Sequence, residues 1–143
     1  MGLGCAPYQV RPRSRTVKHP FAELIDLHFE DKSAGSSTLT LDVGSQHMNP
    51  HGVVHGAVLY ALADTGMGAA LYTTLEHGEI CATIEIKINY FKPISTGKVV
   101  CKTELINRGR TVANLEARLY VEQNLVAQAN GNYAIFRPKR AEA

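Results

Sequence analysis

Residues 57–75 form the longest apolar stretch of the chain, and Asp64 is their only formal charge. Apolar side chains would surround a helix of this sequence on every side, so such a helix cannot lie on a surface with one polar face. The stretch also contains Gly66, Gly68 and several Thr and Tyr residues, which argues against a membrane span. It therefore predicts one long helix that is buried by the rest of the domain.

The regions on both sides of this helix show the two-residue period of strands. A short amphipathic helix of Phe21, Leu24 and Ile25 is expected before them. Two strands are then expected at 26–31 and 37–43, joined by the turn Ser33-Ala34-Gly35, and four more at 83–91, 98–107, 111–122 and 125–136. This order predicts an α+β fold, in which an antiparallel sheet of about six strands, the last four in a meander, wraps around one long buried helix.

Length, charge and cysteine content limit the class of protein. A chain of 143 residues is one domain, expected at 20–137 between a basic, poorly ordered segment at 1–19 and a tail at 138–143. Residues 1–18 hold four basic side chains and no acidic ones, so the rest carries 2 − 4 = −2, which argues against a nucleic-acid surface. Three cysteines and no signal peptide favour a reducing, cytoplasmic location.

The loop before the long helix contains the residues best suited to chemistry, in the run Asn49-Pro50-His51-Gly52-Val53-Val54-His55-Gly56. Gly56 stands where the loop becomes the helix, so its N–H is one of the unpaired donors of a helix N-terminus. Without a side chain it allows a ligand to approach the backbone, as an oxyanion hole requires. His47, His51 and His55 are spaced by four, but Pro50 and Gly52 interrupt any helix, and we predict no metal site.

Asp64 follows Gly56 by eight residues, or about 12 Å along a helix at 1.5 Å per residue. The two residues of one chain are thus too far apart to hold the same small group. Either the helix bends sharply, or Asp64 serves the site of a neighbouring subunit. A carboxylate in a buried helix is costly unless it is paired or functional, and a purely structural bond to a backbone group or a sheet threonine stays open as its role.

These residues resemble the hotdog-fold acyl-CoA thioesterases, and most closely the phenylacetate-pathway (PaaI-like) branch related to the 4-hydroxybenzoyl-CoA thioesterases. The strand Ile84–Pro93 and the following Gly97 are similar to the same family, and the resemblance covers about residues 20–137. It implies a hotdog domain that hydrolyses an acyl-CoA thioester to a free acid and CoA. It also implies no separate cofactor, no membrane, and a homodimer that can pair into a tetramer.

The resemblance further implies a role for each matching residue. Asp64 matches the catalytic carboxylate, as a general base on water or as a nucleophile, and Thr83 matches the residue that holds the water beside it. Gly56 matches the backbone donor to the thioester oxygen, His55 the histidine that polarises or places the carbonyl, and Asn49 the residue that orients the reacting groups. The family implies that Asn49, His55 and Gly56 come from one subunit and that Asp64 and Thr83 come from its partner.

The part of the site that binds CoA is less well defined by the sequence. Arg108 and Arg110 are candidate contacts to the CoA phosphates, although a basic hairpin turn can equally be solvated. The acyl group is not defined, because Tyr60, Tyr72, Tyr90 and Phe91 can line an aromatic pocket or pack the core.

Two other functions of the same fold stay open. A hydratase or dehydratase is one, although His47 stands where the hydratase motif has its catalytic Asp, and the dehydratases place Glu in the helix. A non-catalytic acyl-CoA-binding protein is the other, although the intact Asp64 argues against it.

Overall fold

The computed structural model describes residues 18–139 of the chain. The basic segment expected at 1–19 therefore lies almost wholly outside the described residues, as does most of the tail expected at 138–143. The described part contains two α-helices, one short 3-10 helix and six strands: α1 (Pro20–Leu24), β1 (Leu27–Ser33), β2 (Ser36–Asp42), η1 (Ser45–His47), α2 (Gly56–Tyr72), β3 (Ile80–Tyr90), β4 (Lys98–Arg108), β5 (Val112–Val121) and β6 (Asn124–Phe136).

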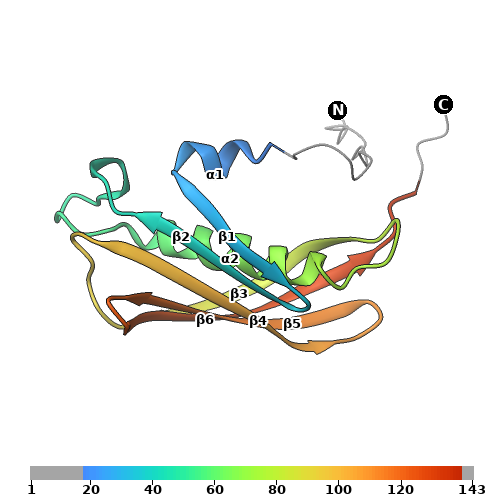
Figure 1. Ribbon diagram of the computed structural model, residues 1–143. Coiled ribbons are helices and arrows are strands. Elements are labelled where there is room, and N and C mark those ends of the chain that lie inside the picture. The colour runs from blue at the N-terminus through green and yellow to red at the C-terminus, as the bar shows by residue number, and fades with distance from the viewer. Residues whose placement is uncertain (1–17, 140–143) are drawn as a thin grey trace, which may run out of the picture.

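The six strands form one antiparallel sheet that curves around α2 (Figure 1). Their order is β1-β2-β4-β5-β6-β3, so β1 and β3 are the two edges. The α+β prediction with one long helix is confirmed. The prediction of a four-strand meander after the helix is wrong in one respect, because only β4, β5 and β6 follow one another. β3 pairs with β6, and the seven-residue link 91–97 carries the chain back across to β4 beside β2.

The core lies between α2 and the inner face of the sheet. Its largest fully buried aliphatic side chains come from both layers: Leu39, Leu41, Leu62, Met67, Leu71, Leu115 and Leu119. Full burial of such a side chain contributes about 1.5–3 kcal/mol. Asp64 is only half-buried.

A small buried polar cluster fixes the middle of α2 against the sheet. Ser37 Oγ and Thr103 Oγ1 both donate to the carbonyl oxygen of Gly66, at 2.9 and 3.0 Å. The helix can approach this closely because Gly66 has no side chain; a Cβ there would lie 2.7 Å from Thr103 Cγ2. Because Gly66 follows Asp64 by two residues, these bonds also fix the position of Asp64 relative to the strands of the sheet.

The short N-terminal helix differs from its prediction. α1 buries Ala22, whereas Phe21 and Leu24 are 51% and 75% exposed, and only Ile25 of the expected apolar face packs against the core. One turn of helix is too short to bury a whole stripe, and α1 extends away from the sheet beside β1 (Figure 1).

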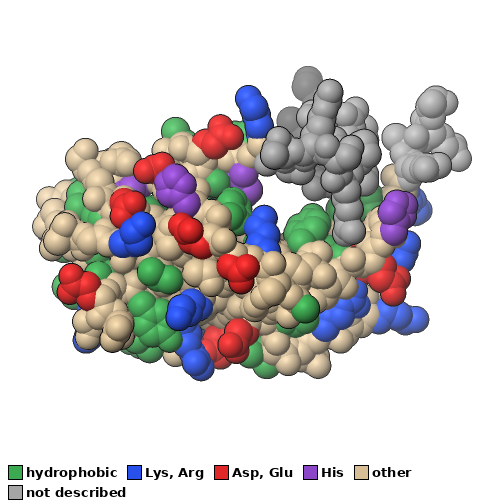
Figure 2. All heavy atoms as spheres, viewed as in Figure 1, with side chains coloured by type: hydrophobic (Ala, Val, Ile, Leu, Met, Phe, Trp, Pro, Cys, Tyr) green, Lys and Arg blue, Asp and Glu red, His purple; other side chains and the backbone are tan. Residues whose placement is uncertain are grey.

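The visible surface has no concentration of one charge. Acidic and basic side chains alternate over the face seen in Figure 2. Within residues 18–139, every helix is too short or too polar to cross a membrane.

Candidate active site

The loop before α2 is closed by Asn49. Its side-chain Oδ1 accepts hydrogen bonds from the backbone N–H groups of His51 (2.8 Å) and Val53 (3.4 Å), and its own N–H donates to the Val53 carbonyl at 2.8 Å. Gly52 takes the left-handed conformation, with φ at +74°, that this tight reversal needs. The Asn49 oxygen is therefore used by the loop, and only the Asn49 NH₂ group can donate to a ligand.

His55 caps the N-terminus of α2 and determines which helix donor stays free. Its Nδ1 accepts from the Ala57 N–H at 2.9 Å, and its carbonyl accepts from the Val58 N–H at 2.9 Å. Nδ1 is therefore the unprotonated nitrogen of the neutral ring, so Nε2 holds the proton. No acceptor within residues 18–139 receives the Gly56 N–H. The cap thus leaves the Gly56 N–H as a free donor at the positive end of the helix.

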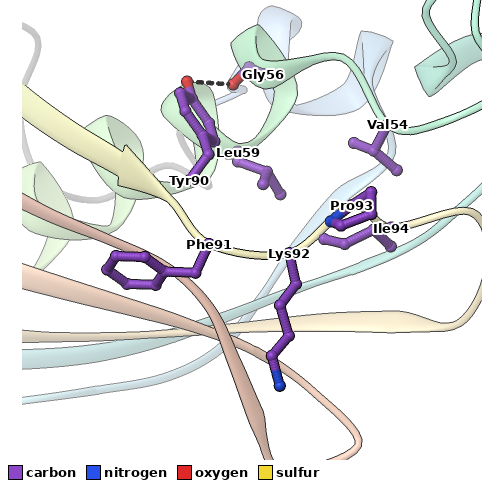
Figure 3. A pocket seen from close by; sticks show the side chains of 8 residues that line it. All are labelled: Val54, Gly56, Leu59, Tyr90, Phe91, Lys92, Pro93 and Ile94. Carbon is purple, nitrogen blue, oxygen red and sulfur yellow. Dashed lines mark hydrogen bonds between the residues drawn. The ribbon is translucent and has the colours of Figure 1, made fainter.

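A surface depression of about 360 Å³ lies next to this donor. Mostly apolar and aromatic residues line it, from the loop, the start of α2 and the segment after β3: Val54, Gly56, Leu59, Tyr90, Phe91, Lys92, Pro93 and Ile94. Figure 3 shows the Tyr90 hydroxyl reaching the carbonyl of Gly56, to which it donates at 2.9 Å, while the Lys92 side chain points away. A Cβ on Gly56 would lie 3.0 Å from Tyr90 Cζ, so the ring packs directly on the glycine.

Asp64 forms a second polar centre further along α2. One of its carboxylate oxygens, Oδ1, accepts from Thr83 Oγ1 at 2.7 Å and from the Tyr133 hydroxyl at 2.9 Å. The Tyr133 hydroxyl also lies 3.0 Å from the Asp64 carbonyl oxygen. Asp64 and Thr83, which the family resemblance places in the same half of the site, are therefore in direct contact.

Thr83 reaches Asp64 because β3 contains a bulge. The register with β6 shifts between Thr83 and Glu85, and the extra residue, Ile84, is 57% exposed. Ile86 and Ile88 pack against the core, so strict alternation along β3 would place Ile84 facing the core and Thr83 facing away; the bulge reverses both. A bulge inserts one residue into the ladder and redirects the side chains before it, which hydrophobic period alone does not reveal.

The thiol and the phenol near the Asp64 carboxylate stay protonated at neutral pH. The pKa of Tyr133 is raised far above its usual value, first by burial and then by the Asp64 charge. Burial, followed by the same charge, raises the pKa of the Cys81 thiol to about 11.

The two arginines of the β4–β5 turn differ in their contacts. Arg108 donates to Glu79 at 2.9 Å and to the Gly109 carbonyl, whereas Arg110 is exposed. Glu79 follows the C-terminal end of α2, so this turn lies at the opposite end of the helix from Gly56 in the same chain.

His47 is buried and caps the short helix η1. Its Nδ1 accepts from the Gly44 N–H and its Nε2 lies 2.7 Å from the Ile25 carbonyl, with 1% of its surface exposed. Three or more His, Cys, Asp or Glu side chains do not gather into a metal-binding group anywhere between residues 18 and 139.

Two tyrosines of this region make contacts that the sequence does not predict. For Tyr90 the sequence leaves open a place in an aromatic pocket or in the core, and for Tyr133 it predicts no role. A signal for Tyr133 exists, because it falls in the inward row of β6 with Ala129 and Ile135, and a buried tyrosine hydroxyl needs a partner.

The chain thus has two polar centres, one at Gly56 and one at Asp64, that do not meet within one protomer. α2 is a continuous helix of 17 residues from Gly56 to Tyr72, so the separation remains about 12 Å along its axis.

Comparison with known proteins identifies the family. Residues 51–128, more than half of the chain, match the family model described as the thioesterase superfamily. A Haemophilus influenzae protein named as an esterase is 34% identical over 85 residues, which are 59% of this chain and 62% of that protein.

Solved structures agree with this match. Conserved protein PA5202 from Pseudomonas aeruginosa has a TM-score of 0.82 at 28% identity, covering 87% of this chain and 100% of that chain. A variant of the phenylacetic acid degradation protein PaaI from Thermus thermophilus has a TM-score of 0.76 at 27% identity, covering 81% of this chain and 98% of that one. The chain therefore belongs to the thioesterase superfamily and has the hotdog fold.

Proposed function

We propose that the protein hydrolyses an acyl-CoA thioester to a free acid and CoA, at a site completed by two subunits. The observation that carries the proposal is the free Gly56 N–H at the start of α2, beside an apolar depression large enough for an acyl group. A helix N-terminal N–H stabilises the negative charge that a thioester oxygen gains in the transition state. His55 adds an Nε2–H donor next to it.

Asp64 supplies the reactive carboxylate from the partner subunit. In the base mechanism, water attacks the carbonyl carbon and gives a proton to Asp64; the C–S bond then breaks, and CoA leaves as the thiol after taking up that proton. In the nucleophilic mechanism, Asp64 attacks the carbonyl carbon, the C–S bond breaks, and CoA leaves as the thiolate. Water then opens the mixed anhydride to the acid and the Asp64 carboxylate, and the thiolate takes up the proton released. After a single turnover in H₂¹⁸O, label in the protein identifies the anhydride opened at Asp64, whereas label in the product acid fits direct attack or opening at the acyl carbon.

The edge strand β3 supports the homodimer. β3 bonds to β6 on one side, its other edge is unpaired within the described part of the chain, and an open edge favours pairing. In a twofold antiparallel pairing of two β3 strands, the Tyr90 end of one lies beside the Ile80 end of the other. Gly56 adjoins the Tyr90 end, and Asp64 adjoins the Ile80 end through Thr83. Such a pairing therefore brings Gly56 of each subunit towards Asp64 of the other.

The same pairing suggests which arginine binds the CoA phosphates. The β4–β5 turn adjoins the Ile80 end of β3 through the ion pair of Arg108 with Glu79. The turn of one subunit then lies on the same side as Gly56 of the other. Because Arg108 is already paired, we assign the phosphate contact to the exposed Arg110.

The test is CoA release, followed with a thiol reagent over a panel of aryl-acyl and fatty-acyl CoA substrates. The wild type is expected to turn over at least one class, and the phenylacetic acid degradation protein among its structural neighbours makes aryl-acyl groups the first to try. Asp64→Asn should lower kcat at least about 10²-fold. It keeps an acceptor oxygen for Thr83 and Tyr133, so the fold should be retained.

Asp42→Asn is the matched control, because within residues 18–139 the Asp42 side chain makes only an exposed ion pair with Lys98. No CoA release from any substrate, or full activity of Asp64→Asn, would contradict the proposed function.

A further inference from the structure

Tyr133 places a phenol under the reactive carboxylate. It lies on β6, is 2% exposed, and its hydroxyl lies within hydrogen-bond distance of both Oδ1 (2.9 Å) and the carbonyl oxygen (3.0 Å) of Asp64. A buried hydroxyl that donates to an ionised acceptor makes one of the stronger protein hydrogen bonds. The phenol therefore links the sheet to the side chain and to the backbone of the same helical residue.

Two glycines hold the Tyr133 ring in one position. A Cβ on Gly131 would lie 3.1 Å from Tyr133 Cε2, and a Cβ on Gly68 would lie 4.0 Å from Cε1. The ring thus fits between β6 and α2 in a space that a side chain at residue 131 would reduce. Its hydroxyl is directed by packing rather than by the hydrogen bonds alone.

The two donors to Asp64 use the same oxygen. Thr83 Oγ1 and the Tyr133 hydroxyl both bond to Oδ1, and no group within residues 18–139 donates to Oδ2. A carboxylate held at one oxygen by two donors from two different strands cannot rotate about its Cβ–Cγ bond without breaking both. Oδ2 is therefore the oxygen that remains available for a reacting molecule.

We propose that Tyr133 is a positioning residue for the hydrolysis, which together with Thr83 fixes Asp64 through Oδ1 so that Oδ2 meets the water or the thioester carbon. The inference rests on the proposed function, because it gives Asp64 the reactive role. It adds a residue that touches no substrate and acts only through the carboxylate.

The titratable groups around Asp64 agree with this role. From β3 the carboxylate is faced by Thr83 and by the Cys81 thiol, and from β6 by Tyr133. The raised pKa values of Cys81 and Tyr133 keep both groups neutral near pH 7. Tyr133 is consequently a hydrogen-bond donor at that pH, and neither group adds a second negative charge beside Asp64.

Tyr133→Phe removes only the hydroxyl and keeps the ring between the two glycines. We expect kcat to fall about 10-fold, with KM changed less than about twofold, because the carboxylate loses its orientation and not its substrate contacts. A role in packing alone would reduce the stability of the protein and leave the kcat of the folded fraction unchanged.

Tyr120→Phe is the matched control, since this half-buried tyrosine faces the other side of the sheet and should keep the wild-type kcat and KM. Asp64→Asn is measured in parallel. If Asp64→Asn is inactive and folded Tyr133→Phe keeps the wild-type kcat, the positioning role is wrong while the proposed function stands. If Asp64→Asn is fully active, both are wrong.

If Tyr133→Phe does not fold, 4-fluorophenylalanine at position 133 provides the test. Its fluorine is close to a hydroxyl in size but cannot donate a hydrogen bond, so kcat should again fall about 10-fold. A folded protein with the wild-type kcat would overturn the proposal.

Discussion

Replacing Gly56 by valine separates the chemical role of this residue from its packing role. A Cβ at this position would lie 3.0 Å from Cζ and 3.1 Å from the hydroxyl of Tyr90, so the ring has to move. Tyr90 is 50% exposed and can rotate outward, at the cost of its hydrogen bond to the Gly56 carbonyl, about 1 kcal/mol. Valine is a better helix former than glycine by a few tenths of a kcal/mol. The net loss of stability should thus stay near 1 kcal/mol, a shift in Tm of about 3–6 °C.

The effect of Gly56→Val on catalysis should be much larger. The branched side chain, or the displaced Tyr90 ring, covers the approach to the N–H, and loss of one such donor lowers kcat about 10²–10³-fold. Thermal melts together with CoA-release rates on the folded protein give both quantities. Ala57→Val is the control, because residue 57 is exposed and its N–H is already bonded to His55. A folded Gly56→Val protein with wild-type kcat would refute the oxyanion role of Gly56.

Two further predictions concern alkaline stability and CoA binding. Burial raises the pKa of Cys101 to about 12, so the folded protein keeps this thiol protonated while the unfolded chain ionises it above its ordinary value of 9.0. The free energy of unfolding should therefore fall as pH rises from about 9 towards 12, by about 1.4 kcal/mol from Cys101 alone at pH 10. Urea titrations at pH 8, 9 and 10 should show a smaller fall in Cys101→Ala, and an equal fall would contradict the reasoning. Arg110→Ala should raise KM several-fold for an acyl-CoA but not for the matching acyl-pantetheine, whereas Arg108→Ala should mainly lower Tm by breaking the half-buried pair with Glu79. An unchanged KM for acyl-CoA in Arg110→Ala would remove that residue from the CoA site.

The sequence predicts the layers of this fold better than their connections. The apolar stretch and the alternating segments identify α2 and the six strands to within a few residues, because burial determines side-chain period directly. The alternation of side chains does not predict that β3 pairs with β6. A strand with the same alternation could stand at either end of the sheet. The hydrogen bond between Thr83 and Asp64 follows from the family resemblance, whereas strict alternation points Thr83 away from the helix; the bulge at Ile84 reconciles the two.

The residues that support the site are harder to predict than those that form it. Gly56 and Asp64 are conspicuous as a glycine at a helix start and a charge in an apolar helix. Tyr133 and Tyr90 act through contacts between segments far apart in sequence, at separations of 69 and 34 residues. Their partners depend on how β6 and β3 pack on α2, which no local pattern determines. The loop role of Asn49 Oδ1 likewise depends on backbone geometry that only the structure contains.

Mixing of inactive subunits tests the central claim that Gly56 and Asp64 act together across two chains. Asp64→Asn and Gly56→Val proteins are each prepared, mixed in equal amounts and allowed to exchange subunits. Half of the dimers are then heterodimers, and a heterodimer with shared sites has one site with both defects and one with none. We predict recovery to about a quarter of wild-type activity, as expected for random exchange in a twofold dimer. No recovery after exchange has been demonstrated by mass spectrometry would contradict a site shared between subunits.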